Sequence, residues 1–473
     1  MSSLIGWSIR NILWPYMERK KGNKIRSYMA EMKKFQSLSK QEICQYQSER
    51  LGELLKHAMK NVPAYQDLDQ ELIRSIDNPA EAIQHFPILT KKYFNQNSES
   101  YIASTADRSQ LIANRTGGST GEPTKFYLDR VTVEHFEAAR WLGLSWSGIQ
   151  IGDRSIMVWG SSIELSKNQS QIHQLKEVLL KNRTIISAYD LREENIKKYL
   201  DEIHSFKPIY LYGYPSALAL LAELMIRNNL RLQIKLNAVV TTAETLQPQQ
   251  REVIQKAFDC NVINEYGARD GGIIAYECPK GHMHISAKNC YLEVVDIHTK
   301  EPVGYNEKGL LLVTDLNNYS MPRIRYQLGD VVSLSDQPCG CGNHLPILAS
   351  LEGREDDVFV ARDGSYVHGN YFNQVMWSLE SFSGYQLIQH TYEDVSLNLV
   401  KNVGSHDFER DEQYFRNEIM KKLGDVYLSI SFVDEIPRSS SGKIRYAVRE
   451  FPLPSTLPIV EKEREKEYTT LHF

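Results

Sequence analysis

The chain lacks long apolar runs, a large number of cysteines and an excess of basic charge, and each absence excludes a class of protein. No stretch of its 473 residues approaches the roughly 18 consecutive apolar residues of a membrane span. Six cysteines are too few for a disulfide scaffold. A net charge of -4 argues against a nucleic-acid partner. We expect a globular protein of two or more domains that acts on small molecules.

The N-terminal segment lacks the basic region and the cleavage site of a signal peptide, so we expect a cytoplasmic protein. Aromatic residues followed by basic residues could form a peripheral membrane anchor, which would use Trp7, Leu13, Trp14, Tyr16, Arg19, Lys20, Lys21 and Lys24. The apolar residues follow no long helical period, so a terminal helix packed on its own domain is the preferred interpretation.

Apolar periodicity divides the chain into two regions. Short strand-like runs alternate with helix-like segments, at 154–159, 208–214, 215–228, 236–242, 247–258 and 260–267. This alternation predicts parallel strands with crossover helices on both faces. After about residue 350, strand-like segments flank a helix-like one, as in a small α+β domain. We expect an α/β fold, with a large domain over 1–352, which has mixed or parallel sheets covered by helices, and a small domain over 353–473.

A glycine-rich loop, NRTGGSTGEPTKF at 114–126, has the chemistry of a phosphate site. Glycines let the backbone N–H groups turn toward an anion, hydroxyl groups can donate to phosphate oxygens, and a lysine adds positive charge. The spacing differs from the Walker pattern, because Glu-Pro-Thr separates Gly121 from Lys125. A kinase or small GTPase is therefore a poor fit, and the loop alone could be a surface turn.

Four further motifs follow this loop along the chain. They are TTAETL (241–246), NEYGARDGG (264–272), IRYQLGDVV (324–332) with EGREDDVF (352–359), and PRSSSGKIR (437–445). Together with the loop they resemble the motifs of the adenylate-forming superfamily, which includes acyl-CoA synthetases, nonribosomal adenylation domains and luciferases. Within it, the chain is most similar to the phenylacetate-CoA ligase branch and to CapK-like relatives encoded with capsular polysaccharide genes.

The resemblance implies a two-step ligase that uses ATP and Mg²⁺. A carboxylate attacks the α-phosphorus of ATP to give an acyl adenylate and pyrophosphate, and a thiol such as CoA or an amine then displaces AMP. The small domain is implied to be a mobile lid that rotates about the hinge residue Asp356 between the two steps.

The resemblance also assigns residues to the nucleotide. The β- and γ-phosphates are assigned to Thr116, Gly117, Gly118, Ser119, Thr120, Gly121 and Lys125. The adenosine and the α-phosphate are assigned to Ala243, Glu244, Glu265, Tyr266, Gly267, Asp330 and Arg354. In this scheme the Tyr266 ring stacks on adenine and Asp330 accepts from the ribose hydroxyls. Lys443 bridges the attacking carboxylate and the α-phosphate, where negative charge gathers.

One motif departs from the family pattern. Relatives usually carry Thr or Ser followed by Glu after the Tyr-Gly pair, and that Glu helps to hold magnesium. This chain has Arg269 and Asp270 instead, which we include among the candidate catalytic residues. Asp270 can still bind a hard cation through oxygen, although its side chain is shorter. The alternative is a structural ion pair between Arg269 and Asp270.

Three cysteines and a histidine form a ligand set typical of structural zinc: Cys278, His284, Cys339 and Cys341. His282 competes with His284 for the fourth position. Similar clusters occur in part of the phenylacetate-CoA ligase branch, which favours zinc over free thiols. The other cysteines are expected to be buried or inert, namely Cys44, Cys260 and Cys290.

The resemblance places the carboxylate substrate beside Trp159, Gly160, Tyr212, Gly213, Tyr214 and Pro215. Their aromatic content is compatible with an aryl, short acyl or amino-acid substrate, but Tyr212 and Tyr214 could equally pack in a core strand. After the hinge, residues 367–369 lack the aromatic residue and proline of many CoA-using relatives. This leaves room for an amine acceptor, such as an amino sugar or amino acid in polysaccharide assembly.

Two other classes of function fit these motifs less well. Asp270 in place of glutamate is the one feature that supports a zinc-stapled scaffold protein with a degenerate nucleotide site. The loop spacing contradicts a Walker-type phosphotransferase. Carboxylate-dependent exchange of pyrophosphate into ATP would distinguish a ligase from both. The carboxylate and the oligomeric state are left open.

Overall fold

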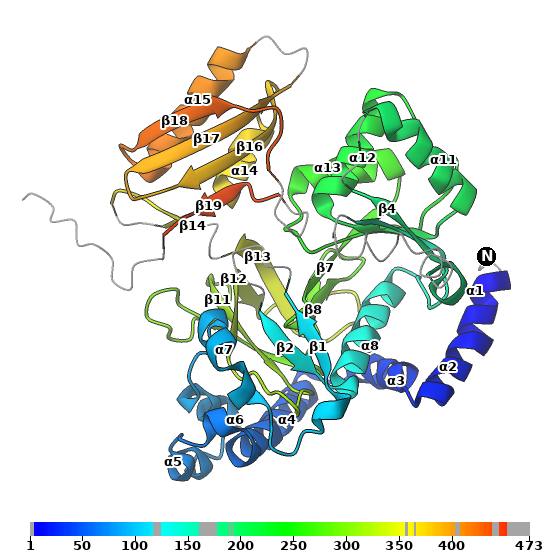
Figure 1. The fold of residues 1–473 in the computed structure, drawn as a ribbon, viewed down its shortest axis with the longest axis vertical. Helices are drawn as coiled ribbons and strands as arrows, with labels where there is room; N and C mark the ends of the chain where they lie inside the picture. Colours follow the sequence, from blue (N-terminus) through cyan, green and yellow to red (C-terminus); the bar gives the residue numbers. More distant parts are fainter. Residues whose placement is uncertain are drawn as a thin grey trace, which may run out of the picture. The chain divides into compact units, whose positions relative to one another are not determined.

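A computed structural model describes residues 4–116, 124–159, 177–188, 191, 193–354, 358–363, 366–402, 407–437 and 444–451. The chain forms two compact units (Figure 1). The large unit comprises Met1–Gly353 with Arg438–Ile444, and the small unit comprises Arg354–Pro437 with Arg445–Phe473. Among the described residues, every helix is too short or too polar to cross a bilayer.

The large unit begins with a series of helices. These are α1 (Leu4–Ser8), the π-helical turn η1 (Ile9–Leu13), α2 (Trp14–Lys21), α3 (Ile25–Phe35), α4 (Lys40–Asn61), η2 (Pro63–Tyr65), α5 (Gln70–Ser75), α6 (Pro79–Ala82), η3 (Ile83–His85), α7 (Lys91–Asn97), η4 (Ser98–Tyr101) and η5 (Arg108–Gln110). A capping box starts α4: Ser39 Oγ accepts from the Glu42 N–H at 3.2 Å, and Glu42 accepts from the Ser39 N–H at 2.8 Å. Its apolar face is buried, as the helical period predicts.

A sheet of 11 strands follows, in the order β10-β11-β12-β13-β9-β8-β7-β6-β5-β3-β4. Its parallel half consists of β3 (Ser155–Trp159), β4 (Arg183–Ser187), β5 (Tyr210–Gly213), β6 (Ala238–Thr242) and β7 (Asn261–Ala268). The remaining strands are β8 (Gly272–Glu277), β9 (Met283–Ile285), β10 (Cys290–Val295), β11 (Gly309–Asp315), β12 (Tyr326–Ser335) and β13 (Ile347–Arg354). The pairs β10–β11, β11–β12, β13–β9, β9–β8 and β8–β7 are antiparallel. The predicted parallel strands therefore form only one side of a mixed sheet.

Helices cover both faces of the parallel half, as the alternating pattern predicts. They are α8 (Arg130–Trp146), η6 (Glu193–Asn195), α11 (Ile196–Phe206), α12 (Pro215–Arg227) and α13 (Pro248–Phe258). Val239 of β6 packs in one core with α11, α12 and α13, whereas Ala238 and Val240 pack on the opposite face with α3 and α8. This alternation follows from the two-residue period of a strand.

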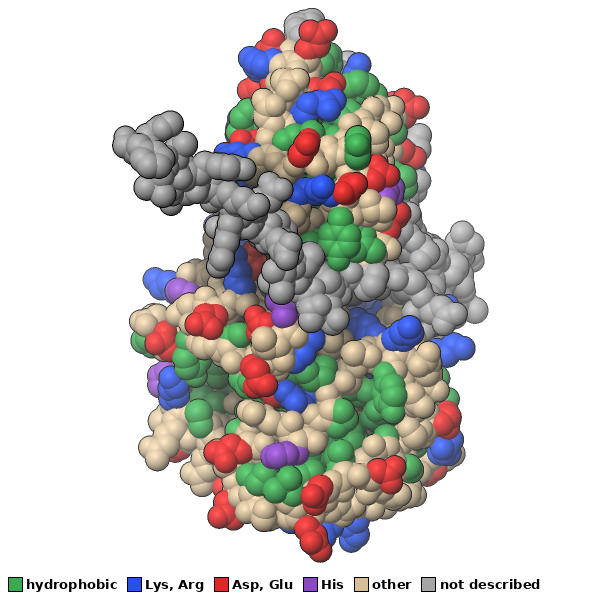
Figure 2. Space-filling model, turned by 90° about the vertical axis from the view of Figure 1, so that its left-hand side faces the viewer, with side chains coloured by type: hydrophobic (Ala, Val, Ile, Leu, Met, Phe, Trp, Pro, Cys, Tyr) green, Lys and Arg blue, Asp and Glu red, His purple; other side chains and the backbone are tan. Residues whose placement is uncertain are grey.

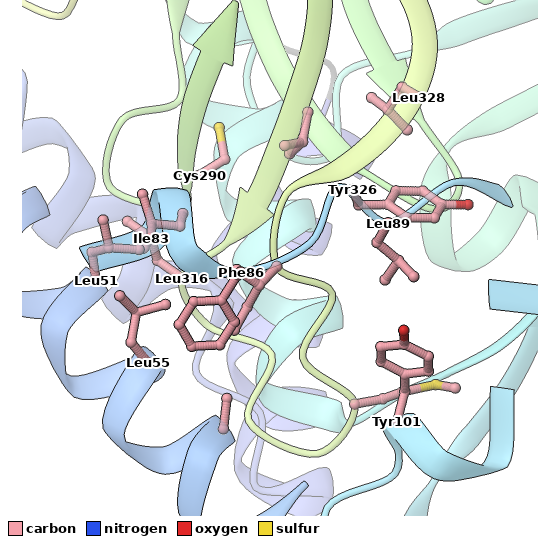
Figure 3. Close-up of a cluster of buried hydrophobic side chains, with 14 of the residues drawn as sticks. Leu51, Leu55, Ile83, Phe86, Leu89, Tyr101, Cys290, Leu316, Tyr326 and Leu328 are labelled. Carbon is pink, nitrogen blue, oxygen red and sulfur yellow. The ribbon is translucent and has the colours of Figure 1, made fainter. Parts of the chain in front are cut away.

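A further core joins the N-terminal helices to the antiparallel half of the sheet. In the close-up of Figure 3, Leu51 and Leu55 of α4 lie beside Ile83 and Phe86. These four side chains are at most 2% exposed. Burial of each large apolar side chain contributes about 1.5 to 3 kcal/mol, so this core holds the helices to the sheet that carries the site.

The small unit has the predicted α+β composition. Its elements are β14 (Val358–Val360), β15 (Tyr366–His368), α14 (Asn370–Trp377), β16 (Phe382–Gln389), β17 (Asp394–Lys401), α15 (Phe408–Leu423), β18 (Tyr427–Phe432) and β19 (Ala447–Arg449). Four strands form a sheet in the order β18-β17-β16-β19, and α14 and α15 share its separate core.

Acidic and basic side chains are interspersed on the face of the large unit drawn in the lower part of Figure 2. Such mixing produces little long-range field of one sign at this face.

Candidate active site

The predicted phosphate loop is flanked by two strands that pair as a β-hairpin. Strands β1 (Ile112–Arg115) and β2 (Lys125–Leu128) pair antiparallel. The Thr116 N–H donates to the Thr124 carbonyl at 3.0 Å, and the Thr124 N–H donates to Thr116 Oγ1 at 2.9 Å. Lys125 is exposed at the base. The rest of the predicted set, Gly117, Gly118, Ser119, Thr120 and Gly121, lies outside the described residues.

Several predicted residues lie at the carboxyl ends of the parallel strands. Trp159 ends β3, Gly213 ends β5, and Ala243 directly follows β6. Ligands of open α/β sheets bind at this edge. Gly160, which follows Trp159, lies outside the described residues.

The adenine segment has a strained backbone and a tethered acid. Ala243 has φ of 69°, a left-handed conformation that residues with a Cβ seldom adopt. Glu244 Oε2 accepts from the Ser216 N–H at 3.1 Å, at the beginning of α12. This contact joins the predicted adenine segment to Tyr214 and Pro215, which were predicted to line the substrate pocket.

Two tyrosine–carboxylate hydrogen bonds connect two of the motifs. Tyr266 Oη donates to Asp330 Oδ2 at 2.6 Å, and Tyr326 Oη donates to Asp270 Oδ2 at 2.9 Å. The tyrosine of each motif thus binds the aspartate of the other. The residue predicted to stack on adenine is thereby fixed beside the residue predicted to hold the ribose. A β-bulge between Tyr266 and Gly267 accompanies this arrangement.

Asp270 is buried and paired with a cation that the sequence did not indicate. Lys91 Nζ lies 3.4 Å from Asp270 Oδ2, whereas Arg269 is exposed. Burial alone would raise the pKa of Asp270, but the positive charges of Lys91 and Arg323 outweigh burial and hold the pKa below its ordinary value. The carboxylate is therefore ionised at neutral pH. Asp270 thus forms its ion pair with Lys91 of α7.

Arg323 is a second buried cation at this place. It is 3% exposed, and its guanidinium carbon lies 4.7 Å from the ring centre of Phe126 and 5.5 Å from that of Tyr326. These distances are those of cation–π contacts. Phe126 of β2 and Tyr326 thus contact the same guanidinium, so β2, Tyr326, Asp270 and the two cations form one connected group.

An aromatic group occupies the predicted substrate region. The Trp159 ring centre lies 4.4 Å from that of Tyr214 and 6.1 Å from that of Tyr212. A Cβ at Gly213 would lie 2.5 Å from the Val158 carbonyl oxygen, so only glycine lets the strands approach here. Tyr214 is 2% exposed, so it packs in the core, which was the alternative to a place in the substrate pocket.

Glu265 takes part in a polar network on the other side of β7 from Tyr266. Tyr212 Oη donates to Glu265 Oε1 at 2.6 Å, and Arg140 Nε lies 3.4 Å from Glu265 Oε2. Burial and the charge of Glu265 raise the pKa of Tyr212 far above its ordinary value, so the phenol keeps its proton. Glu265, predicted at the nucleotide, thus contacts a residue predicted at the substrate. Sequence reasoning missed Arg140 of α8, because nothing in the neighbouring sequence marks it.

The predicted zinc ligands lie together. One donor atom from each of Cys278, His284, Cys339 and Cys341 lies within 4.8 Å of the others. The sulfur atoms of Cys278 and Cys339 are 3.7 Å apart, close to the edge of about 3.8 Å that four tetrahedral Zn–S bonds of about 2.3 Å define. His284 is buried, and its Nδ1 lies 3.1 Å from the Leu345 carbonyl, which leaves Nε2 toward Cys341. His282 is exposed, and its Nδ1 lies 3.3 Å from Cys339 Sγ, but the group of four donor atoms within 4.8 Å contains His284.

The remaining predictions have mixed outcomes. Cys290 is buried, Cys260 is half-buried and Cys44 is exposed, so for Cys44 only the expectation of an inert thiol is left, and it stays a prediction. Lys443 and Asp356 lie outside the described residues. Arg354 ends β13, but its side chain also lies outside them.

Comparisons with known proteins agree with these motifs. The CapK C-terminal domain family matches residues 359–450. Protein CapK of Staphylococcus aureus is 26% identical over 436 residues, which cover 89% of this chain and 92% of CapK. The phenylacetate-coenzyme A ligase of Thermus thermophilus is 23% identical over 441 residues, which cover 87% of this chain and 97% of that ligase.

Solved structures show the same fold. A 2-hydroxyisobutyryl-CoA ligase in the postadenylation state has a TM-score of 0.69 at 17% identity, with 88% of this chain and 91% of that chain covered. An anthranilate CoA ligase in complex with anthranoyl-AMP has a TM-score of 0.53 at 16% identity, with 72% of this chain and 66% of that chain covered. The chain is a homologue of CapK and the phenylacetate-CoA ligases and has the fold of the adenylate-forming ligases.

Proposed function

We propose that this protein is an adenylate-forming ligase, which activates a small carboxylate with ATP and transfers the acyl group to an acceptor. The observation that carries the proposal is the hydrogen bond between Tyr266 and Asp330, at 2.6 Å. It brings the ring expected to stack on adenine beside the carboxylate expected to bind the ribose, and it fixes both side chains before a nucleotide arrives.

In the first step, a carboxylate oxygen of the substrate attacks the α-phosphorus of ATP. The bond from that phosphorus to the oxygen bridging the β-phosphate breaks, and pyrophosphate leaves with the electron pair. The loop between Thr116 and Thr124 would hold the leaving phosphates through its backbone N–H groups. Lys443 would neutralise the charge between the two reacting anions.

The Asp270 carboxylate already has partners and so does not offer a free oxygen ligand for magnesium at Oδ2. Its Oδ2 atom accepts from Tyr326 and lies 3.4 Å from Lys91 Nζ. A metal ion would have to displace the lysine, so we assign no step to magnesium at this carboxylate. Lys91 and Arg323 supply positive charge there instead, and Mg²⁺ would enter bound to ATP.

The acceptor is proposed to be the thiol of CoA. The phenylacetate-coenzyme A ligases among the relatives support this choice. An amide-forming reaction with an amino sugar or amino acid in polysaccharide biosynthesis is the second candidate. It is favoured by residues 367–369, which lack the pattern of CoA-using relatives, and by similarity to an indoleacetate–lysine synthetase of Pseudomonas savastanoi, which covers 29% of this chain.

Cys278, His284, Cys339 and Cys341 are proposed to hold one structural zinc ion. Four protein ligands leave no open position, so the ion would stabilise the loops and take no part in the reaction. A ligase that consumes ATP is proposed to work in the cytoplasm.

Pyrophosphate exchange into ATP with a panel of carboxylates tests the proposal. We expect exchange with at least one aryl, short acyl or amino acid, and a loss of about 10²-fold or more in Lys443→Ala, because one charge-stabilising group is removed. Lys421→Ala, at an exposed lysine of α15, is the matched control. Nucleotide binding without exchange for any carboxylate would instead support the scaffold alternative.

A further inference from the structure

The N-terminal helices leave an apolar surface exposed. Five large apolar side chains are exposed between residues 4 and 16: Leu4 by 86%, Ile5 by 60%, Trp7 by 52%, Ile12 by 59% and Tyr16 by 60%. Isolated exposed apolar residues are ordinary, but a group of five within one short segment marks an interaction surface. We call these five residues the N-terminal patch.

The other side of this N-terminal segment packs against the rest of the large unit. Ile9 is 3% exposed, and Gly6 packs so closely on Gly152 that a Cβ at Gly152 would lie 2.7 Å from the Gly6 carbonyl oxygen. Arg10 donates to Asp153 at 2.8 Å, and Trp14 meets Trp141 edge to face at 6.2 Å. The expectation that this helix packs on its own domain therefore holds for one side only. Figure 1 shows α1 and α2 along the outer edge of the large unit.

Basic residues continue the patch at its C-terminal end. Arg19, Lys20, Lys21 and Lys24 are exposed. The one acidic residue between positions 4 and 24, Glu18, is buried and pairs with Arg26. The whole chain carries a net charge of -4, so this local excess of positive charge opposes the overall sign.

We propose that the N-terminal patch and these four basic residues bind the surface of an anionic lipid bilayer. Apolar side chains would enter the boundary between headgroups and acyl chains, while the basic residues would meet the lipid phosphates. Trp7 and Tyr16 suit this depth, because their rings are apolar with one polar atom each. The helices lie on the membrane and do not cross it.

A second copy of this chain fits the surface less well. A symmetric dimer through the patch would bring the two sets of four basic residues together, and like charges repel across a shared interface. An anionic bilayer supplies the opposite charge over the whole contact.

Cosedimentation with vesicles tests the proposal. We expect the full-length protein to bind vesicles of equal parts phosphatidylcholine and phosphatidylglycerol, to bind phosphatidylcholine alone much more weakly, and to dissociate as sodium chloride is added. Arg19→Gln/Lys20→Gln/Lys21→Gln should weaken binding about a hundredfold, at about fivefold for each basic residue lost. Ile5→Ser/Ile12→Ser should weaken it at least about tenfold.

Matched controls change the same residue types elsewhere in the large unit. Arg231→Gln/Lys235→Gln/Lys256→Gln removes three exposed basic residues, and Leu72→Ser/Tyr305→Ser removes two exposed apolar ones. Both should bind vesicles as the unchanged protein does, and pyrophosphate exchange should be the same in all variants. Binding that does not distinguish the two vesicle types, or that the patch variants leave unchanged, overturns the proposal. A concentration-dependent dimer in analytical ultracentrifugation that Ile5→Ser/Ile12→Ser dissociates would assign the patch to a second copy and also overturns it.

Discussion

At the scale of single residues, the site depends on two reciprocal hydrogen bonds. Tyr266 binds Asp330, and Tyr326 binds Asp270. Each tyrosine stands four residues before the aspartate of its own motif but binds that of the other motif. Because all four side chains are buried, a change in one is expected to disturb the geometry of both motifs.

The first prediction concerns the hydroxyl of Tyr266. Tyr266→Phe keeps the aromatic ring but leaves the buried Asp330 carboxylate without this donor, at a cost of about 1 to 3 kcal/mol. We expect KM for ATP to rise about tenfold in pyrophosphate exchange, with a smaller change in kcat. Tyr291→Phe, on the edge strand β10, is the control. An unchanged KM for ATP would show that the hydroxyl has no part in placing the nucleotide.

The second prediction concerns Asp315, a buried acid at the end of β11. Burial raises its pKa from 3.8 to about 7, while the Asn317 N–H and Arg323 oppose the shift. Between pH 4 and 7 the unfolded carboxyl loses its proton while the folded one keeps it, so this group lowers stability as pH rises. Asp315→Asn should therefore match the unchanged protein near pH 4 and become more stable by a few kcal/mol above pH 7.

Urea unfolding at several pH values measures this difference. The exposed Asp336→Asn serves as the control and should shift stability by a similar small amount at each pH. A difference between Asp315→Asn and the unchanged protein that stays constant from pH 4 to 8 would contradict the raised pKa.

The sequence predicted site residues that lie within recognisable motifs, and it missed the neighbours that only the fold brings to them. Tyr266 and Asp330 could be assigned by resemblance, and the three cysteines with His284 by their ligand chemistry. Lys91, by contrast, lies in α7 and meets Asp270 only because the helix packs beside β12. Nothing within a few residues of Lys91 or Arg140 marks them, since their partners are distant along the chain.

At the scale of elements, the parallel half of the sheet was predictable and the antiparallel half was not. Strands β5 and β6 are each followed by a helix of clear apolar period, so the alternation appears in the sequence. Strand β11 is buried on both faces along its whole length. It therefore shows no alternation of apolar and polar residues, and its pairing depends on contacts far along the chain.

The third prediction concerns the elements that the proposed zinc ion would join. Cys278 follows β8 and His284 lies in β9, while Cys339 and Cys341 lie between β12 and β13. We expect about one zinc ion per purified chain by elemental analysis. Cys341→Ser should lower the melting temperature more than it lowers exchange activity per folded molecule, because the metal ties loops together.

Cys44→Ser, at an exposed cysteine outside the cluster, is the control and should leave both quantities unchanged. A protein without zinc whose four-residue cluster reacts rapidly with an alkylating reagent in the native state would refute the metal site.

At the scale of the whole molecule, the chain separates into two units with their own cores. The boundary follows Gly353, within the charged motif EGREDDVF, which contains the expected hinge residue Asp356. Separate cores let each unit keep its packing if the linker turns, which a two-orientation mechanism requires.

The last prediction tests whether that turning is needed. Asp356→Pro fixes φ near about -65° at the proposed hinge, whereas Asp356→Ala removes the same carboxylate and leaves the backbone free. If the two steps need different orientations of the small unit, the proline variant should keep most of its pyrophosphate exchange and lose most of its overall product formation. The alanine variant should keep both. Equal losses of exchange and product formation in the proline variant would mean that the linker only tethers the units, and the two-orientation mechanism would fail for this protein.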